Sequence, residues 1–138
     1  MQEKQLRLVI TQKANGEEDI TTLVTEGKVV QKETAWYVHY KEELVDSGEV
    51  SNIVKIDDQS LQIIRQGTLQ MKQVFQKGKS TEGLYKSPYG NMHMRTKTFE
   101  WRLTKEDQMP SHLYVGYQLW LNEQYIGEFN WELTISDY

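Results

Sequence analysis

The most informative absence in this sequence is cysteine, of which the 138 residues contain none. Disulfide bonds, thiolate metal sites and cysteine nucleophiles are therefore excluded. Proline occurs only twice, and no stretch approaches the ~20 consecutive apolar residues that a membrane helix needs. The opening stretch, MQEKQLRLVITQKANG, lacks the apolar core and cleavage site of a secretory signal. We therefore expect a cytoplasmic protein that does not enter a membrane.

Charged residues are unevenly distributed, although the net charge is only −4. Residues 1–71 carry 8 Lys and Arg against 12 Asp and Glu (−4), residues 72–105 carry 8 against 2 (+6), and residues 106–138 carry 6 acids and no base (−6). The simplest explanation is charge pairing between neighbouring strands of one sheet. The alternative is a basic surface at 72–105 for an anionic partner. The overall acidity disfavours nucleic acid as that partner.

Alternation of apolar and polar residues dominates the chain and predicts strands rather than helices. The cleanest example runs from Leu113 to Leu121, and the Asn-Gly at 15–16 is typical of a hairpin turn. We expect such strands, joined by short connections, to form a single domain over residues 1–138. The pattern predicts an all-β fold, an antiparallel up-and-down barrel of about 8–10 strands, because closure removes exposed strand edges.

The segment from Asn91 to Thr104 changes its alternation part-way along. Met94 and Thr98 share one phase, whereas Phe99 and Trp101 share the other. A regular strand cannot move its inward face to the other parity, so we expect a bulge or sharp bend near 97–99, with Phe99 pointing inward after it. Residues 105–111 are expected to form a loop.

Arg65 is in phase with the apolar Leu61 and Ile63, so it is expected to face the barrel interior. The same parity places other polar side chains inside: Tyr40, Glu42, Gln73, Tyr85, Thr96, Thr98 and Tyr117. Because a guanidinium keeps its proton, its burial requires a partner. Two alternatives stay open. Glu42 pairs with Arg65 as a structural bridge, or Arg65 binds the polar group of a ligand in a barrel pocket.

No motif for catalysis or metal binding is present. His39, His93 and His112 are far apart and have no metal-ligand spacing. There is no nucleophile elbow and no phosphate-binding glycine loop. We expect no catalytic residue, no metal and no cofactor, and a non-enzymatic role is favoured. Trp120 has outward parity, which indicates either a homodimer or partner contact, or cover by a neighbouring segment.

Several short motifs resemble the DUF1934 family of uncharacterised bacterial proteins. They are RQG at 65–67, LQMKQVFQKG at 69–78, LYKSPYG at 84–90, MRTKT at 94–98 and YKEE at 40–43. The resemblance covers most of the chain and is specific over residues 36–98. It implies a calycin-like, lipocalin-like barrel and implies no activity.

Two functions fit these observations. The first is a barrel that binds a small anionic or amphipathic ligand in its interior, with Arg65 as the anchor. The second is a non-catalytic interaction module, either a homodimer or a protein that docks on an anionic partner through the basic surface at 72–105.

Overall fold

A computed structural model describes residues 2–45 and 48–137, which form ten strands and no helix. The strands are β1 (Gln2–Ala14), β2 (Glu17–Lys32), β3 (Ala35–Leu44), β4 (Gly48–Ile56), β5 (Ser60–Gln66), β6 (Gln70–Gln76), β7 (Ser80–Ser87), β8 (Gly90–Glu106), β9 (Met109–Leu121) and β10 (Gln124–Ser136). Each strand pairs with the next, and β10 returns to β1, which closes the barrel. The predicted all-β, antiparallel up-and-down barrel is confirmed. Among the described residues, no helix could cross a membrane.

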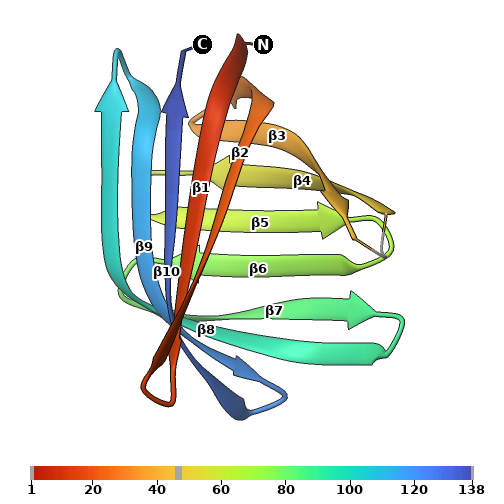
Figure 1. Ribbon diagram of the computed structural model, residues 1–138. Helices are drawn as coiled ribbons and strands as arrows, with labels where there is room; N and C mark the ends of the chain where they lie inside the picture. The colour runs from red at the N-terminus through yellow and green to blue at the C-terminus, as the bar shows by residue number, and fades with distance from the viewer. Residues whose placement is uncertain (1, 46–47, 138) are drawn as a thin grey trace.

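The barrel is flattened into two layers whose strands cross steeply (Figure 1). β1, β2, β9 and β10 run along one layer, and β3 to β7 form the other. β8 belongs to both layers, because it pairs with β7 up to Lys97 and with β9 from Met94 to Glu106. In sheets that cross in this way, a strand passes from one layer to the other through a bend or bulge, as β8 does here.

The bulge expected in β8 is confirmed, because the register against β9 shifts between Thr98 and Glu100. Phe99 is the extra residue and is 49% exposed, so its predicted inward position is wrong. A Cβ on Gly116 would lie 3.1 Å from a carbon of the Phe99 ring, so the ring occupies the space left by the missing side chain. The physical reason is that a bulge leaves its extra residue out of the inward series.

The predicted loop at 105–111 is also wrong. β8 continues to Glu106 and β9 begins at Met109, so only Asp107 and Gln108 form the turn. Both turn residues have positive φ, 50° and 68°, as a two-residue type I′ hairpin requires. The turn contains no glycine, the residue that usually marks such a hairpin, so its residue types do not predict it.

Buried apolar side chains fill one part of the barrel interior, and the other part contains a cavity. The fully buried apolar residues include Leu6, Val38, Ile56 and Leu133, none more than 1% exposed. Burying each aliphatic side chain of this kind contributes about 1.5–3 kcal/mol to folding. The half that contains Trp131 is less completely filled, and the candidate site lies there.

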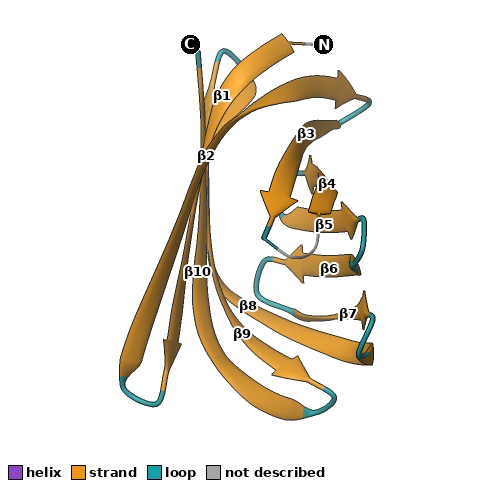
Figure 2. Ribbon diagram, turned by 45° about the vertical axis from the view of Figure 1, so that its right-hand side comes forward, coloured by secondary structure: helices purple, strands orange, loops and turns teal. Residues whose placement is uncertain are grey.

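One corner of the wall is only partly closed. β2 and β3 pair over five residues, from Lys28↔His39 to Lys32↔Ala35. Beyond that point, among the described residues, β2 pairs only with β1 and β3 only with β4. Figure 2 shows the two strands separating below this junction. The β1–β2 register does not shift at Gly27, so no bulge marks this glycine. Gly27 is instead a close approach, where a Cβ would lie 2.8 Å from the His39 carbonyl oxygen.

Candidate functional site: an interior cavity with an ion pair

A cavity of about 230 Å³ lies inside the barrel beside the open corner. Its lining residues come from eight strands and are mostly apolar or aromatic. They are Leu8, Ile10, Thr21, Leu23, Tyr40, Glu42, Asn52, Ile63, Arg65, Met71, Gln73, Tyr117, Phe129 and Trp131. Thr21 and Leu23 on β2, and Glu42 on β3, lie where these two strands no longer pair with each other, which places the cavity mouth between them.

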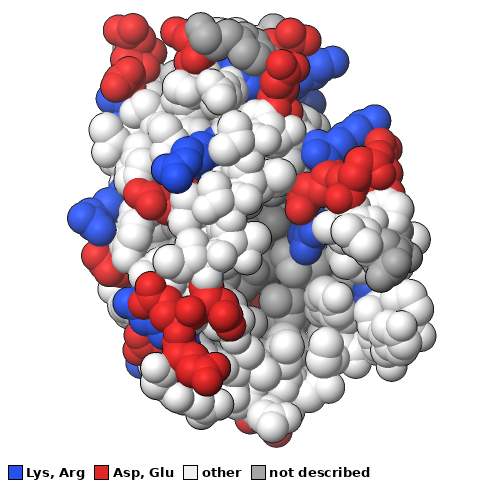
Figure 3. Space-filling model, viewed as in Figure 1, with Lys and Arg blue, Asp and Glu red and all other residues white. Residues whose placement is uncertain are grey.

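The mouth is visible as a hollow in the molecular surface. Figure 3 shows a hollow beside β1 and β2, over the middle strands of the other layer, with uncharged side chains as well as acidic and basic ones around it. The cavity behind the mouth is lined mainly by apolar and aromatic side chains.

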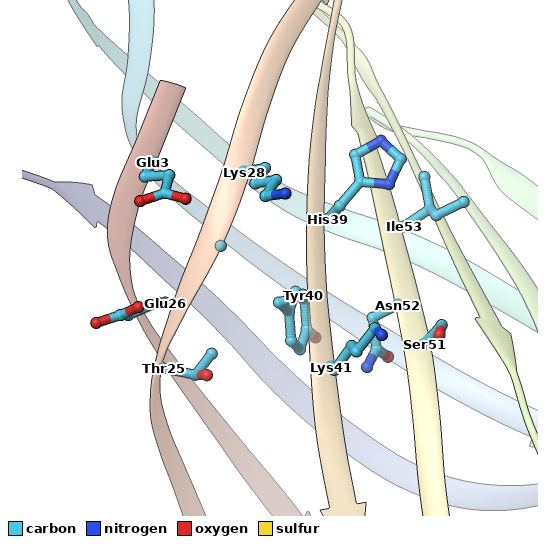
Figure 4. Close-up of a pocket in the computed structure, with 11 residues that line it drawn as sticks. Glu3, Thr25, Glu26, Lys28, His39, Tyr40, Lys41, Ser51, Asn52 and Ile53 are labelled. Carbon is cyan, nitrogen blue, oxygen red and sulfur yellow. The ribbon is translucent and has the colours of Figure 1, made fainter. Parts of the chain in front are cut away.

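A second hollow, of about 430 Å³, lies across the outer wall at the same corner. It is bordered by charged side chains of both signs, among them Glu26, Lys28 and Lys41. In Figure 4 these side chains project sideways from β2 and β3, and Tyr40 projects from β3 toward the gap between the two strands. Tyr40 and Asn52 border both hollows, so the outer groove and the inner cavity meet where β2 and β3 separate. We place the candidate site inside, because the inner cavity is lined by side chains that point into the barrel from eight strands, including the Arg65–Glu42 pair.

A cross-strand row positions the polar side chains of the cavity. Tyr40 on β3 is opposite Asn52 on β4, Asn52 is opposite Arg65 on β5, and Arg65 is opposite Met71 on β6. Because side chains directly opposite each other lie about 4.5–5.5 Å apart on the same face of a sheet, all four point inward. Glu42 is two residues beyond Tyr40 on the same face, within reach of Arg65.

Glu42, Asn52 and Arg65 form a closed hydrogen-bonded triad. Arg65 Nη2 donates to Glu42 Oε1 at 3.2 Å, and Arg65 Nε donates to Asn52 Oδ1 at 3.1 Å. Asn52 Nδ2 donates to the same Glu42 oxygen at 2.9 Å. The arginine and glutamate side chains are 23% and 21% exposed, whereas Asn52 is buried. The guanidinium is therefore inside the barrel near its mouth, as predicted, and Glu42 is its partner.

Burial keeps two tyrosines of the cavity wall protonated. The pKa of Tyr40 is raised far above its usual value near 10, chiefly by desolvation and secondarily by the Glu42 charge, while Arg65 partly offsets the shift. Desolvation also raises the pKa of Tyr117, and a hydrogen bond with Gln73 partly offsets this shift. Tyr117 stacks on Phe129 at 5.2 Å between ring centroids. At neutral pH the two hydroxyls are therefore uncharged hydrogen-bonding groups.

The other predicted interior residues lie deeper or to one side. Gln73 is 5% exposed and donates to Thr96 Oγ1 at 3.1 Å. Thr96 and Thr98 are both 1% exposed but do not border the cavity. Tyr85, opposite Met71 on β7, is partly buried against the core and is also outside the lining. Five of the eight predicted residues therefore line the cavity, and they are Tyr40, Glu42, Arg65, Gln73 and Tyr117. The other three, Tyr85, Thr96 and Thr98, lie outside its lining.

Sequence reasoning missed several lining residues, of which Asn52 is the most important. It shares the inward parity of Val50 and Val54, so the alternation in VSNIVKI did contain the signal. Trp131 and Phe129 follow an inward series as well, but their distance in sequence from Arg65 concealed that they share one cavity with it.

The two buried threonines give a matched test of polar burial. Among the described residues, Thr98 Oγ1 is buried without a hydrogen-bond partner, whereas Thr96 Oγ1 accepts from Gln73. We expect Thr98→Val to raise the free energy of unfolding by about 1 kcal/mol, because it removes an unsatisfied hydroxyl at nearly constant volume. Thr96→Val should lower it by about 1 kcal/mol, because the Gln73 amide loses its acceptor. Urea denaturation measures both, and changes of the same sign would contradict the assignment.

Metal-ligating residue types do not gather in the described part of the chain. No group of three or more His, Asp or Glu residues there could hold a metal ion. His112 pairs with Glu132 at 2.6 Å, and His93 pairs with Glu82. Trp120 is partly covered, because the Arg95 guanidinium lies 4.5 Å from its ring centroid.

Ten strands closed around a cavity with one ion pair near its mouth define a small β-barrel protein with an interior pocket. The chain belongs to the family described as "Domain of unknown function (DUF1934)", whose model matches residues 6–133. The family resemblance seen in the sequence is thereby confirmed.

Two comparisons with a protein from Bacillus subtilis agree with this assignment. The chain is 32% identical over 84 residues to the "Uncharacterized beta-barrel protein YwiB" of strain 168, an alignment that spans 61% of this chain and 58% of that relative. The crystal structure of ywiB protein from Bacillus subtilis matches with a TM-score of 0.81 at 22% identity, covering 99% of this chain and 92% of the other. At that identity the structural match shows the shared barrel fold.

Proposed function

We propose that this protein binds one small amphipathic molecule inside its barrel, with Arg65 as the polar anchor. The observation that carries the proposal is the position of the Arg65–Glu42 pair on the wall of a cavity whose other sides are apolar and aromatic. Pockets that hold small molecules combine mainly apolar walls with a few convergent polar groups. Barrels of about this strand number, including those with a lipocalin-like form, can enclose one small ligand.

The cavity size limits the ligand to a small molecule. Its volume of about 230 Å³ exceeds that of the apolar cavities, about 150 Å³, that bind benzene. It falls below the ~300–1,000 Å³ of pockets for drug-sized ligands. A compound with one or two rings, or a short branched chain, fits this space, whereas a haem or a long fatty acid does not.

The test compares a variant that fills the cavity with one that does not. Leu23 borders the cavity on β2 and is only partly buried, so Leu23→Trp can place an indole in the mouth without displacing the packed half of the core. Its neighbour Val24 points outward and is 54% exposed, which makes Val24→Trp the matched control. We expect native mass spectrometry of freshly purified protein, and ligand-detected NMR with small aromatic fragments, to show binding to the wild type and to Val24→Trp but not to Leu23→Trp. Equal binding to both tryptophan variants would disprove an interior site.

The alternative function, docking on an anionic partner or a second copy through the basic surface at 72–105, stays a prediction. Several charges of that segment have partners within the chain: Arg102 pairs with Glu100 at 3.4 Å, and Lys105 pairs with Asp58 at 2.7 Å. Their contribution to an external partner is reduced accordingly, and the interior site is the better supported of the two. The cytoplasmic location expected from the sequence likewise stays a prediction.

A further inference from the structure

The cavity wall is electrically balanced. Only two of its lining residues carry a formal charge, and these are Arg65 and Glu42, which have opposite signs. Tyr40 and Tyr117 stay protonated, as argued above from their burial, so they add no charge at neutral pH. A ligand therefore meets no net charge at the polar end, although it meets one full cation and one full anion side by side.

The triad also leaves N–H donors of Arg65 and an acceptor oxygen of Glu42 unused in the same place. Glu42 accepts both of its hydrogen bonds through Oε1, and Arg65 donates through Nε and Nη2. Among the hydrogen bonds of the described residues, Glu42 Oε2 and Arg65 Nη1 have no protein partner. A guanidinium nitrogen can only donate, and a carboxylate oxygen can only accept. The polar end of the cavity thus presents a donor next to an acceptor.

We propose that the ligand has a neutral head group with one donor and one acceptor, such as a carboxamide or the amide edge of a heterocycle, on a flat apolar body. This inference rests on the proposed function and specifies its ligand class. An anionic head group would bond to Arg65 but would lie against the Glu42 carboxylate, and a cationic head group would meet the reverse conflict. Like charges in such a partly desolvated site repel strongly. The stacked Tyr117 and Phe129 rings, 9° from parallel, and Trp131 provide flat apolar surfaces for the body of the ligand.

Three compounds of nearly identical shape test the head group: benzamide, benzoate and benzamidinium. They present a donor with an acceptor, acceptors alone and donors alone, respectively. We expect the wild-type protein to bind benzamide at least about tenfold more tightly than either ion, as measured by titration calorimetry. Equal affinities, or a preference for benzoate, would overturn the inference while leaving the interior site intact, provided that Leu23→Trp still blocks binding.

Two substitutions should change the preference in opposite directions. Glu42→Gln leaves Arg65 as the only charge in the lining, so benzoate should become the tightest of the three compounds. Arg65→Met leaves Glu42 alone, so benzamidinium should become the tightest. A preference that stays the same in both variants would overturn the inference. Circular dichroism checks that each variant is folded, and if one is not, the wild-type order of affinities still decides. If none of the compounds binds to any variant, the proposed function fails together with the head-group assignment.

Discussion

Above pH 10 the barrel is expected to lose stability steeply, because folding buries two tyrosines that must remain protonated. Tyr40 and Tyr117 have pKa values raised above their usual value near 10, chiefly by desolvation. The unfolded chain releases these protons near pH 10, whereas the folded barrel retains them. Their favourable contribution is therefore complete below pH 10 and declines as the pH rises toward the folded-state values. The loss amounts to about 1.4 kcal/mol per pH unit for each tyrosine.

Urea denaturation at a series of pH values from about 8 to about 11 would measure this dependence. In Tyr117→Phe the free energy of unfolding should fall less steeply with pH above pH 10, by the share of one tyrosine. The variant also loses the hydrogen bond with Gln73. Tyr89 is fully exposed, so Tyr89→Phe should follow the wild-type profile. The same slope in Tyr117→Phe as in the wild type would show that this hydroxyl is not the titrating group.

A second large effect is expected from breaking the Arg65–Glu42 pair. Either single substitution, Arg65→Met or Glu42→Gln, removes one charge of a pair that is about four-fifths buried. Breaking a fully buried pair costs about 3–5 kcal/mol, so with partial solvent access we expect roughly 2–3 kcal/mol for Arg65→Met, which leaves the carboxylate without its cation. The double variant should cost about 1 kcal/mol or less, because no unpaired charge remains.

A double-mutant cycle isolates the interaction between these two side chains. Lys41 and Glu49 supply the control, because they form an ion pair between the neighbouring strands β3 and β4 at 3.6 Å but are 70% and 52% exposed. Their coupling should be close to zero in the same urea measurements. If the effects of Arg65→Met and Glu42→Gln simply add, the pair contributes no specific stability, and the anchoring function of Arg65 becomes its main explanation.

These experiments also separate the two roles left open by the sequence. The structure shows that Glu42 does bind Arg65, which is the structural alternative, and that both side chains border a cavity, which the ligand-binding alternative requires. The two roles are compatible, because the triad uses only part of the hydrogen-bonding capacity of the guanidinium and the carboxylate. A ligand can therefore bind without displacing the internal bridge.

The sequence alone determined the strands, the inward direction of Arg65 and the bulge in β8. These features are local, because side chains alternate along a strand with a period of two, and a change of parity must be absorbed where it occurs. The same rule identified Glu42 as a partner and placed Tyr40, Gln73 and Tyr117 inside. The hairpin at Asp107–Gln108 escaped because its backbone conformation is not the one that its residue types usually indicate.

Only the tertiary structure decided which inward residues share one cavity and where it opens. Parity places Asn52, Thr96 and Trp131 inside equally, but only the order and curvature of the strands put Asn52 between Glu42 and Arg65, Trp131 on the cavity wall and Thr96 behind it. The end of pairing between β2 and β3 after Lys28↔His39 likewise depends on how the two layers cross. The physical reason is that alternation specifies the face of a strand, whereas depth, neighbours and openings arise from packing between strands that are distant in sequence.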